Sequence, residues 1–142
     1  MIDIENQIFG KISTALRAEF DPIFVSGELV KAPATFPAVY IEEKANNAYQ
    51  RTQDSGSLEN HVSLMYEINV YSNKKTGKKS GKKSGKKSEC KAIFAVIDNE
   101  FQKMGFTRIM KEPVANLEDG TIYRMVGRYT AVVSVGGTIY RR

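Results

Sequence analysis

The sequence predicts an α+β fold: a mainly antiparallel sheet with two helices packed on one face, in the order α-β-β-β-α-β-β. Two stretches, 4–19 and 88–104, repeat apolar residues at helical spacing, whereas the stretch 62–71 alternates strictly between apolar and mostly polar residues. Turn-forming residues separate the other short apolar runs. A length of 142 residues fits a single domain, 1–142.

The first helix is predicted over about residues 4–19, where the apolar side chains share one face. Asp3 can accept a hydrogen bond from the first turn, and Arg17 lies near the carboxyl end, where the helix dipole favours a cation. Asp21-Pro22 ends the helix, and a short apolar strand is expected at 23–25. The apolar stripe consists of Ile4, Ile8, Ile12 and Leu16.

Two longer strands form the centre of the predicted sheet. The first begins at 36–41, where Pro37 lacks a backbone donor and therefore suits the first position of a strand or an edge. The polar stretch 45–60 is expected to be the tip of a long hairpin. The second strand, 61–71, is apolar at every even position, so one of its faces should be buried and the other wetter.

The second helix is expected to begin at an N-cap, Ser88, and to end at Gly105 in the left-handed position, with Phe106 contacting Phe101. Two strands close the domain, from 106 to about 115 and from 121 to 135. The turn 117–120 between them contains Asp-Gly, a strong hairpin signal. The apolar stripe of the helix is Cys90, Ile93, Phe94, Ile97, Phe101 and Met104.

A lysine-rich segment interrupts the otherwise ordinary composition. Residues 74–88 read KKTGKKSGKKSGKKS, with three identical copies of GKKS, and hold eight of the 21 Lys and Arg residues. The rest of the chain has 13 basic residues against 16 acidic ones, a balance of −3. Because the segment has no apolar residue to offset its ordering entropy, a flexible loop is predicted at 73–88.

Two interpretations of this segment stay open. The lysines could contact DNA or another acidic partner, because cations neutralise phosphates in any sequence context. Alternatively, a short tandem duplication lengthened a surface loop that tolerates extra residues. Every Gly-Lys is followed by another Lys, so the segment does not fit a phosphate-binding loop of the Walker A type. The candidate contact residues are Lys74, Lys75, Lys78, Lys79, Lys82, Lys83, Lys86 and Lys87.

The residues that carry most enzyme chemistry are scarce. His61 and Cys90 are the only histidine and cysteine, and Cys90 lies on an apolar stripe, so it is expected to be a core thiol. Glu42 and Glu43 should point to opposite faces of a strand, and Asp98 is expected on the solvent side of its helix. The sequence therefore predicts no enzyme, no catalytic or metal site and no cofactor.

The polar sides of the long strands offer a candidate subunit contact, although they could equally be plain surface. No apolar run reaches the roughly 20 residues that span a bilayer, and the first residues do not form a signal peptide, so folding in a cytoplasm without a membrane partner is expected. The candidate contact residues are Glu67, Asn69, Arg124 and Arg128.

Several short motifs occur in a recognisable order: Phe-Pro-Ala-Val-Tyr at 36–40, the alternating strand 61–71, a Met-Gly-Phe ending of the run 91–106, NLEDGTIYR at 116–124, and Arg-Tyr at 128–129. With the first helix and short strand, this order resembles the tail terminator, or tail-completion, proteins of long-tailed bacteriophages. It is most similar to versions from phages and prophages of Gram-positive hosts. The resemblance covers nearly the whole chain, but the lysine repeat is not part of the family's pattern.

The resemblance implies a structural virion protein, assembled in the host cytoplasm and located at the head-proximal end of the tail. Such proteins form a homo-oligomeric ring, commonly a hexamer, that caps the tail tube protein, stops its polymerisation and provides the docking surface for the head–tail connector protein. DNA would pass through the lumen. Two alternatives stay open: another head–tail connector or minor capsid protein, and a small nucleic-acid-binding module that uses the lysine loop.

Overall fold

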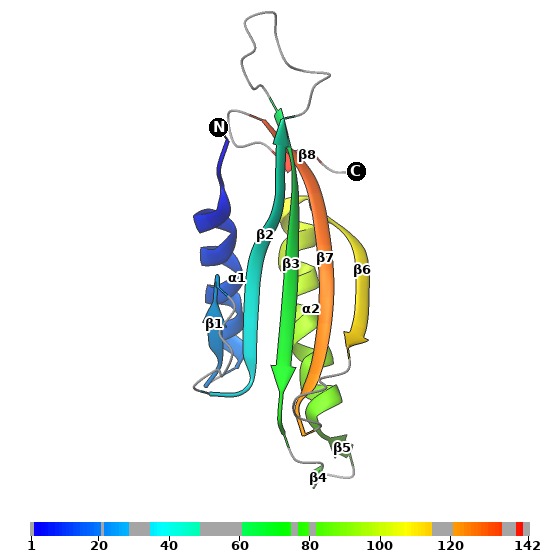
Figure 1. The fold of residues 1–142 in the computed structure, drawn as a ribbon. Coiled ribbons are helices and arrows are strands. Elements are labelled where there is room, and N and C mark those ends of the chain that lie inside the picture. The colour runs from blue at the N-terminus through cyan, green and yellow to red at the C-terminus, as the bar shows by residue number, and fades with distance from the viewer. Residues whose placement is uncertain are drawn as a thin grey trace, which may run out of the picture.

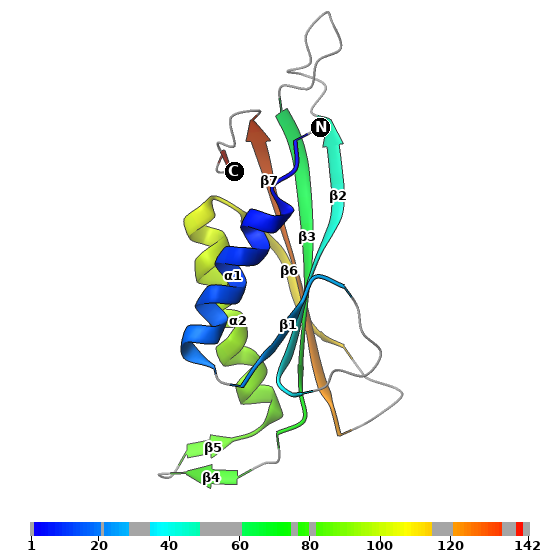
Figure 2. The same cartoon turned by 90° about the vertical axis from the view of Figure 1, so that its left-hand side faces the viewer.

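Figures 1 and 2 show the computed structural model, which describes residues 2–20, 22–28, 35–48, 61–74, 77–79, 82–114, 121–134 and 139–140. A six-stranded sheet has the order β1-β2-β3-β7-β6, with β8 beside β7, and both helices cover one of its faces (Figure 2). This confirms the predicted fold class, element order and helix placement. The strands are β1 (Phe24–Ser26), β2 (Ala38–Ala48), β3 (His61–Ser72), β6 (Thr107–Val114), β7 (Tyr123–Ser134) and β8 (Ile139–Tyr140).

The sheet is antiparallel except for the parallel pair β1–β2. Its central strands β3 and β7 have 12 residues each, which corresponds to a length of about 40 Å. Strand β2 continues to Ala48, so the prediction of a hairpin tip from residue 45 starts too early. Residues 49–60 and the predicted turn 117–120 lie outside the described ranges.

Helix α1 (Glu5–Glu19) confirms the first prediction almost to the residue. The Asp3 Oδ1 atom accepts a hydrogen bond of 3.0 Å from the backbone N–H of Glu5, so Asp3 satisfies a donor that the first turn leaves unpaired. On the other face Ile8, Ile12 and Leu16 are completely buried against the sheet and the second helix. The four-residue spacing of the sequence is therefore the core face of the helix.

Helix α2 (Lys86–Met104) begins earlier than predicted. Its N-cap is Gly85, in an extended conformation, and the backbone N–H of Glu89 donates to the carbonyl of Gly85 at 2.9 Å. The prediction of Ser88 as N-cap is therefore wrong, because the helical hydrogen bonds already include it. The Glu89 carboxylate instead accepts a 2.7 Å hydrogen bond from the Ser72 hydroxyl, which attaches the first turn of α2 to the end of β3.

The lysine segment is partly regular, contrary to the prediction of a loop throughout 73–88. Strands β4 (Gly77–Lys79) and β5 (Lys82–Ser84) pair with each other antiparallel, and α2 follows directly. Pairing between backbone groups requires no apolar side chain, so composition alone gave no sign of it. Lys75 lies outside the described residues.

The centre of the core is aromatic. Phe101 stacks on Tyr129 with ring centroids 4.3 Å apart and meets Phe106 edge-on at 5.1 Å. Gly105 has a φ of 95°, and the N–H of Phe106 donates to the Phe101 carbonyl at 2.9 Å, which confirms the predicted helix ending. Opposite α2, Gly127 leaves space for the ring of Phe94, since a Cβ there would lie 2.7 Å from the Phe94 Cε1 atom.

Candidate functional site

The predicted subunit-contact residues all lie on the outer face, which we define as the face of the sheet opposite the helices. Glu67 and Asn69 belong to β3, and Arg124 and Arg128 belong to the adjacent β7. The even-numbered residues of β3 lie in the core, so these odd-numbered ones point away from the helices. Strand pairing places Glu67 directly opposite Arg128 and brings the four residues together in one patch.

Glu67 is the centre of a charge network on the outer face. Its Oε2 atom lies 3.6 Å from the Lys44 Nζ and 3.7 Å from the Arg128 Nη2 atom, and its side chain is only 13% exposed. Glu42 is the register partner of Glu67 on β2, and the two like charges are bridged by Lys44, which lies 2.9 Å from the Glu42 Oε2 atom. Hydrogen bonding to Glu42 raises the pKa of Lys44, so the ammonium stays charged.

Asn69 holds Arg124 in position next to this network. Its Oδ1 atom accepts hydrogen bonds from the Arg124 Nε at 3.0 Å and Nη2 at 2.7 Å, and the guanidinium lies 5.6 Å from the centroid of the Tyr71 ring. Asn69 is 3% exposed, so a partner could contact Arg124 and Tyr71 but not Asn69 itself. The sequence analysis did not identify Lys44 and Tyr71 as parts of this surface. For Lys44, the available signal was its position two residues after Glu42, which places both side chains on the same strand face as Glu67.

The lysine segment lies at one end of the molecule, beyond the ends of β3 and β7 (Figures 1 and 2). The structure places Lys78, Lys79, Lys82 and Lys83 in the strands of the small hairpin. At its borders Lys74 and Lys87 are exposed, and the Lys86 ammonium donates to the Thr121 carbonyl at 3.4 Å. The candidate lysines with described positions therefore gather at a single end of the sheet.

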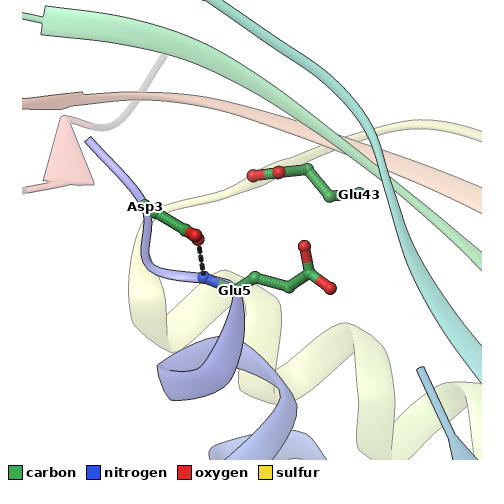
Figure 3. A group of neighbouring side chains, drawn as sticks. All are labelled: Asp3, Glu5 and Glu43. Atoms are coloured by element: carbon green, nitrogen blue, oxygen red, sulfur yellow. Dashed lines mark hydrogen bonds between the residues drawn. The ribbon is translucent and has the colours of Figure 1, made fainter. Parts of the chain in front are cut away.

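An acidic cluster lies near the first turn of α1 (Figure 3). Carboxylate oxygens of Asp3, Glu5 and Glu43 come within 4.8 Å of one another, a spacing that could hold one cation. Two acceptors are already used: Asp3 Oδ1 by the Glu5 N–H, and Glu43 Oε1 by the Tyr66 hydroxyl at 3.2 Å. Burial, and then the neighbouring carboxylates, raise the pKa of Glu43. None of the three carboxylates forms an ion pair with a described cation.

The side chains considered for chemistry do not come together. The Cys90 thiol is buried and lies 3.8 Å from the Val70 carbonyl, at the opposite end of β3 from His61. Burial raises the pKa of Cys90 to about 12, so the thiolate is disfavoured at neutral pH. As expected, Glu42 and Glu43 face opposite sides of β2: the first contacts Lys44 on the outer face and the second contacts Tyr66 in the core.

Asp98 was expected on the solvent side of its helix, but the structure shows that its carboxylate contacts two other elements. Its Oδ1 atom accepts hydrogen bonds from the Tyr129 hydroxyl at 3.0 Å and from Arg108 Nη1 at 3.2 Å, which connects α2 to β7 and β6. These side chains line a cleft of about 320 Å³ that also includes Gln102 and Thr107. Burial and the nearby carboxylate raise the pKa of Tyr129, so its hydroxyl remains a donor. The apolar stripe of α2 gave no sign of this contact, because the contact depends on how β6 and β7 pack beside the helix.

Within the described ranges, neither helix has the length and apolar character needed to cross a membrane. The sequence matches no protein-family model, and a comparison with the curated proteins finds no similar protein.

Proposed function

We propose that this chain is a ring-forming assembly protein of a phage tail, a tail terminator that caps the tail tube and provides the docking surface for the head. The proposal rests on the resemblance of its ordered motifs to that family and on one feature of the structure. This feature is the concentration of lysines at one end of an elongated sheet (Figure 1).

The position of the lysine hairpin supports an end-specific role. In a ring whose subunits stand side by side with their strands along the axis, equivalent ends of all subunits lie at the same height. The hairpins would then form one basic rim or line one mouth of the lumen. Such a rim suits DNA entering the tail or an acidic connector surface, because clustered cations attract polyanions over several ångströms.

The outer face supports the same proposal in a different way. Arg124 is oriented by two hydrogen bonds to Asn69, and Lys44 and Arg128 lie 3.6 Å and 3.7 Å from Glu67, so the outer face presents three cations next to one another. A steric cap needs such preformed surfaces more than it needs reactive groups. The function is geometric: one face of the ring is complementary in shape to the end of the tube, and the ring offers no binding surface for further tube subunits.

Inactivation of the gene in the phage that encodes this chain tests the proposal. We expect tails of uncontrolled length and filled heads without joined tails in electron micrographs, and both defects should disappear when the chain is supplied in trans. Tails of normal length that remain unjoined to heads would instead favour the head–tail connector. Normal virions would contradict any role in tail assembly.

A nucleic-acid-binding module is the second candidate, favoured by the same lysine hairpin. A variant with serine at Lys78, Lys79, Lys82 and Lys83 tests it, with Lys91→Ser and Lys103→Ser on α2 as a control for lysine loss elsewhere. If the module binds duplex DNA, affinity should fall steeply with salt in the wild-type chain and the slope should be smaller in the hairpin variant only. Equal and weak binding by all three proteins would remove this candidate.

A further inference from the structure

The two edges of the sheet are open in the described part of the molecule. Strand β1 pairs with β2 only from Ala38 to Tyr40, so the rest of β2, up to Ala48, has no strand on that side. On the opposite edge β6 pairs only with β7. Open edges present unpaired backbone groups and are normally protected or used for contacts.

The two edges differ in net charge: the groove on the β2 edge is mainly acidic and the β6 edge is mainly basic. A groove of about 380 Å³ on the β2 edge is lined by Glu5, Gly27, Glu28, Glu42, Glu43 and Lys44. The β6 edge instead carries Arg108 and Lys111, whose side chains point toward the helix side of the sheet, and one exposed carboxylate, Glu112, which points toward the outer face. The Arg108 guanidinium contacts Asp98, and the Lys111 ammonium lies 5.9 Å from the centroid of the Phe94 ring. Lys111 forms no ion pair with a described carboxylate.

Ile109 adds an apolar anchor to the β6 edge. It lies at an irregularity between Arg108 and Met110, where β6 has one more residue than β7, and it is 52% exposed. Among the described residues, Ile109 is the one large apolar side chain that is exposed. A bulge at an edge re-aims a side chain, so Ile109 offers an apolar contact between the charged residues of this edge.

These features lie at the same height in the sheet. Arg108 is the register partner of Tyr129, Tyr129 of Tyr66, and Tyr66 of Glu43. The next rung consists of four register partners on neighbouring strands: Met110, Arg128, Glu67 and Glu42. A rotation about an axis along the strands keeps each rung at its own height, so the basic edge of one copy would meet the acidic edge of the next.

We propose that the β6 edge of one copy, with Ile109, Arg108 and Lys111, docks against the acidic groove on the β2 edge of a second copy. The contact is heterologous, because each copy uses two different surfaces, and it can therefore close into a ring. The occupant is a second copy because Arg108 on the β6 edge and Glu43 on the β2 edge share one rung of the sheet, with Ile109 and Lys111 directly beside it, so a rotation brings the basic edge to the acidic one. This inference rests on the proposed ring and names the surfaces that close it.

Two edge variants test this docking by sedimentation velocity at high protein concentration. Ile109→Glu with Lys111→Glu alters the β6 edge, and Glu5→Lys with Glu28→Lys alters the β2 edge. Each variant alone should associate about 100-fold more weakly than the wild type, because like charges would face each other across the contact. Mixing them should restore assembly, since each variant keeps the edge that the other has lost and the altered edges are themselves complementary.

Lys91→Glu and Glu19→Lys, on the exposed sides of the helices, serve as control charge reversals of the same sign as the edge variants and should leave association unchanged. Circular dichroism confirms that each variant is folded. A wild-type chain that stays monomeric, edge variants that assemble like the wild type, or a mixture that stays monomeric would each overturn the docking. Tail-length control measured in the phage is a separate readout, so a functional terminator whose ring does not depend on these edges would contradict this inference alone.

Discussion

The two faces of one sheet differ in how their side chains are satisfied. On the helix side, the even-numbered residues of β3 are at most 1% exposed and pack against the aromatic cluster around Phe101. On the outer face, Glu67 and Asn69 of the same strand form ion pairs and hydrogen bonds with Lys44 of β2 and with Arg124 and Arg128 of β7, and these three cations remain partly accessible. Because the main buried cluster lies on the helix side, we expect that side to supply most of the stability, which leaves the other face and the sheet edges available for assembly.

The largest effect is expected for Phe101→Ala. The Phe101 ring is fully buried and contacts the rings of Tyr129, Phe106 and Tyr66, so its removal leaves a cavity between α2 and the sheet. We expect a loss of about 3–5 kcal/mol in the free energy of unfolding, measured by urea denaturation. A loss below about 1 kcal/mol would show that the helix-side core is not the main source of stability.

Two glycines provide a matched pair for the same face. Gly127→Ala would place a Cβ 2.7 Å from the buried Phe94 ring, so we expect a loss of about 1–3 kcal/mol. Gly10→Ala in α1 meets no atom within 4 Å and should stabilise the helix by up to about 1 kcal/mol. Thermal unfolding of both variants gives opposite shifts in Tm. Equal shifts would contradict the close packing of Gly127 against α2.

On the outer face, Glu67→Gln should have a much smaller effect. The substitution removes the ion pairs with Lys44 and Arg128 but also relieves the repulsion between Glu67 and Glu42. We expect a loss of about 0.5 kcal/mol that shrinks in high salt, because Lys44 and Arg128 are 43% and 44% exposed and their pairs with Glu67 are therefore weak and screened. If urea denaturation gives a loss comparable to that of Phe101→Ala, the contrast between the two faces does not hold.

The smallest effect is expected for Glu43→Gln, and it depends on pH. Burial raises the pKa of Glu43 in the folded state, so the folded chain binds the proton more tightly than the unfolded chain. Stability therefore falls as the pH rises from the ordinary carboxyl pKa through the raised value. The Gln variant avoids this loss and should be more stable at pH 7 by a few tenths of a kcal/mol, after allowance for solvent screening.

The pH profile of the same pair supplies the control. Below the ordinary carboxyl pKa of 4.5, Glu43 is protonated in both states, so the two proteins should have equal stability. A Gln variant that is less stable than the wild type at pH 7 would show that the Tyr66 hydrogen bond to the carboxylate outweighs the cost of burial.

Periodicity predicted most of the fold because the local pattern and the tertiary burial coincide. The four-residue spacing of α1, the alternation in β3 and the Gly105 ending of α2 each reflect a single element packed on one core. The paired lysine strands and the early start of α2 depend on backbone hydrogen bonds, which composition does not record. The same holds for Asp98, whose partners Tyr129 and Arg108 come from two other elements.

For the candidate surfaces, as for the fold, the sequence predicted the local pattern but not the contacts between elements. Alternation placed Glu67, Asn69, Arg124 and Arg128 on one face, but their mutual contacts depend on strand register, which only the paired sheet defines. The difference in net charge between the two sheet edges depends on the order of the strands in space. That order brings Glu43 and Arg108 to one rung although they are distant in sequence.

The proposal that the chain caps a tail tube predicts the length of tubes assembled from the tube protein encoded beside it. Electron micrographs of tubes grown with and without the chain give this length. We expect that addition of the chain stops elongation and leaves ring-shaped density at one end of each tube. Tubes that grow to the same length with the chain present, and that carry no additional density at their ends, would contradict the proposal.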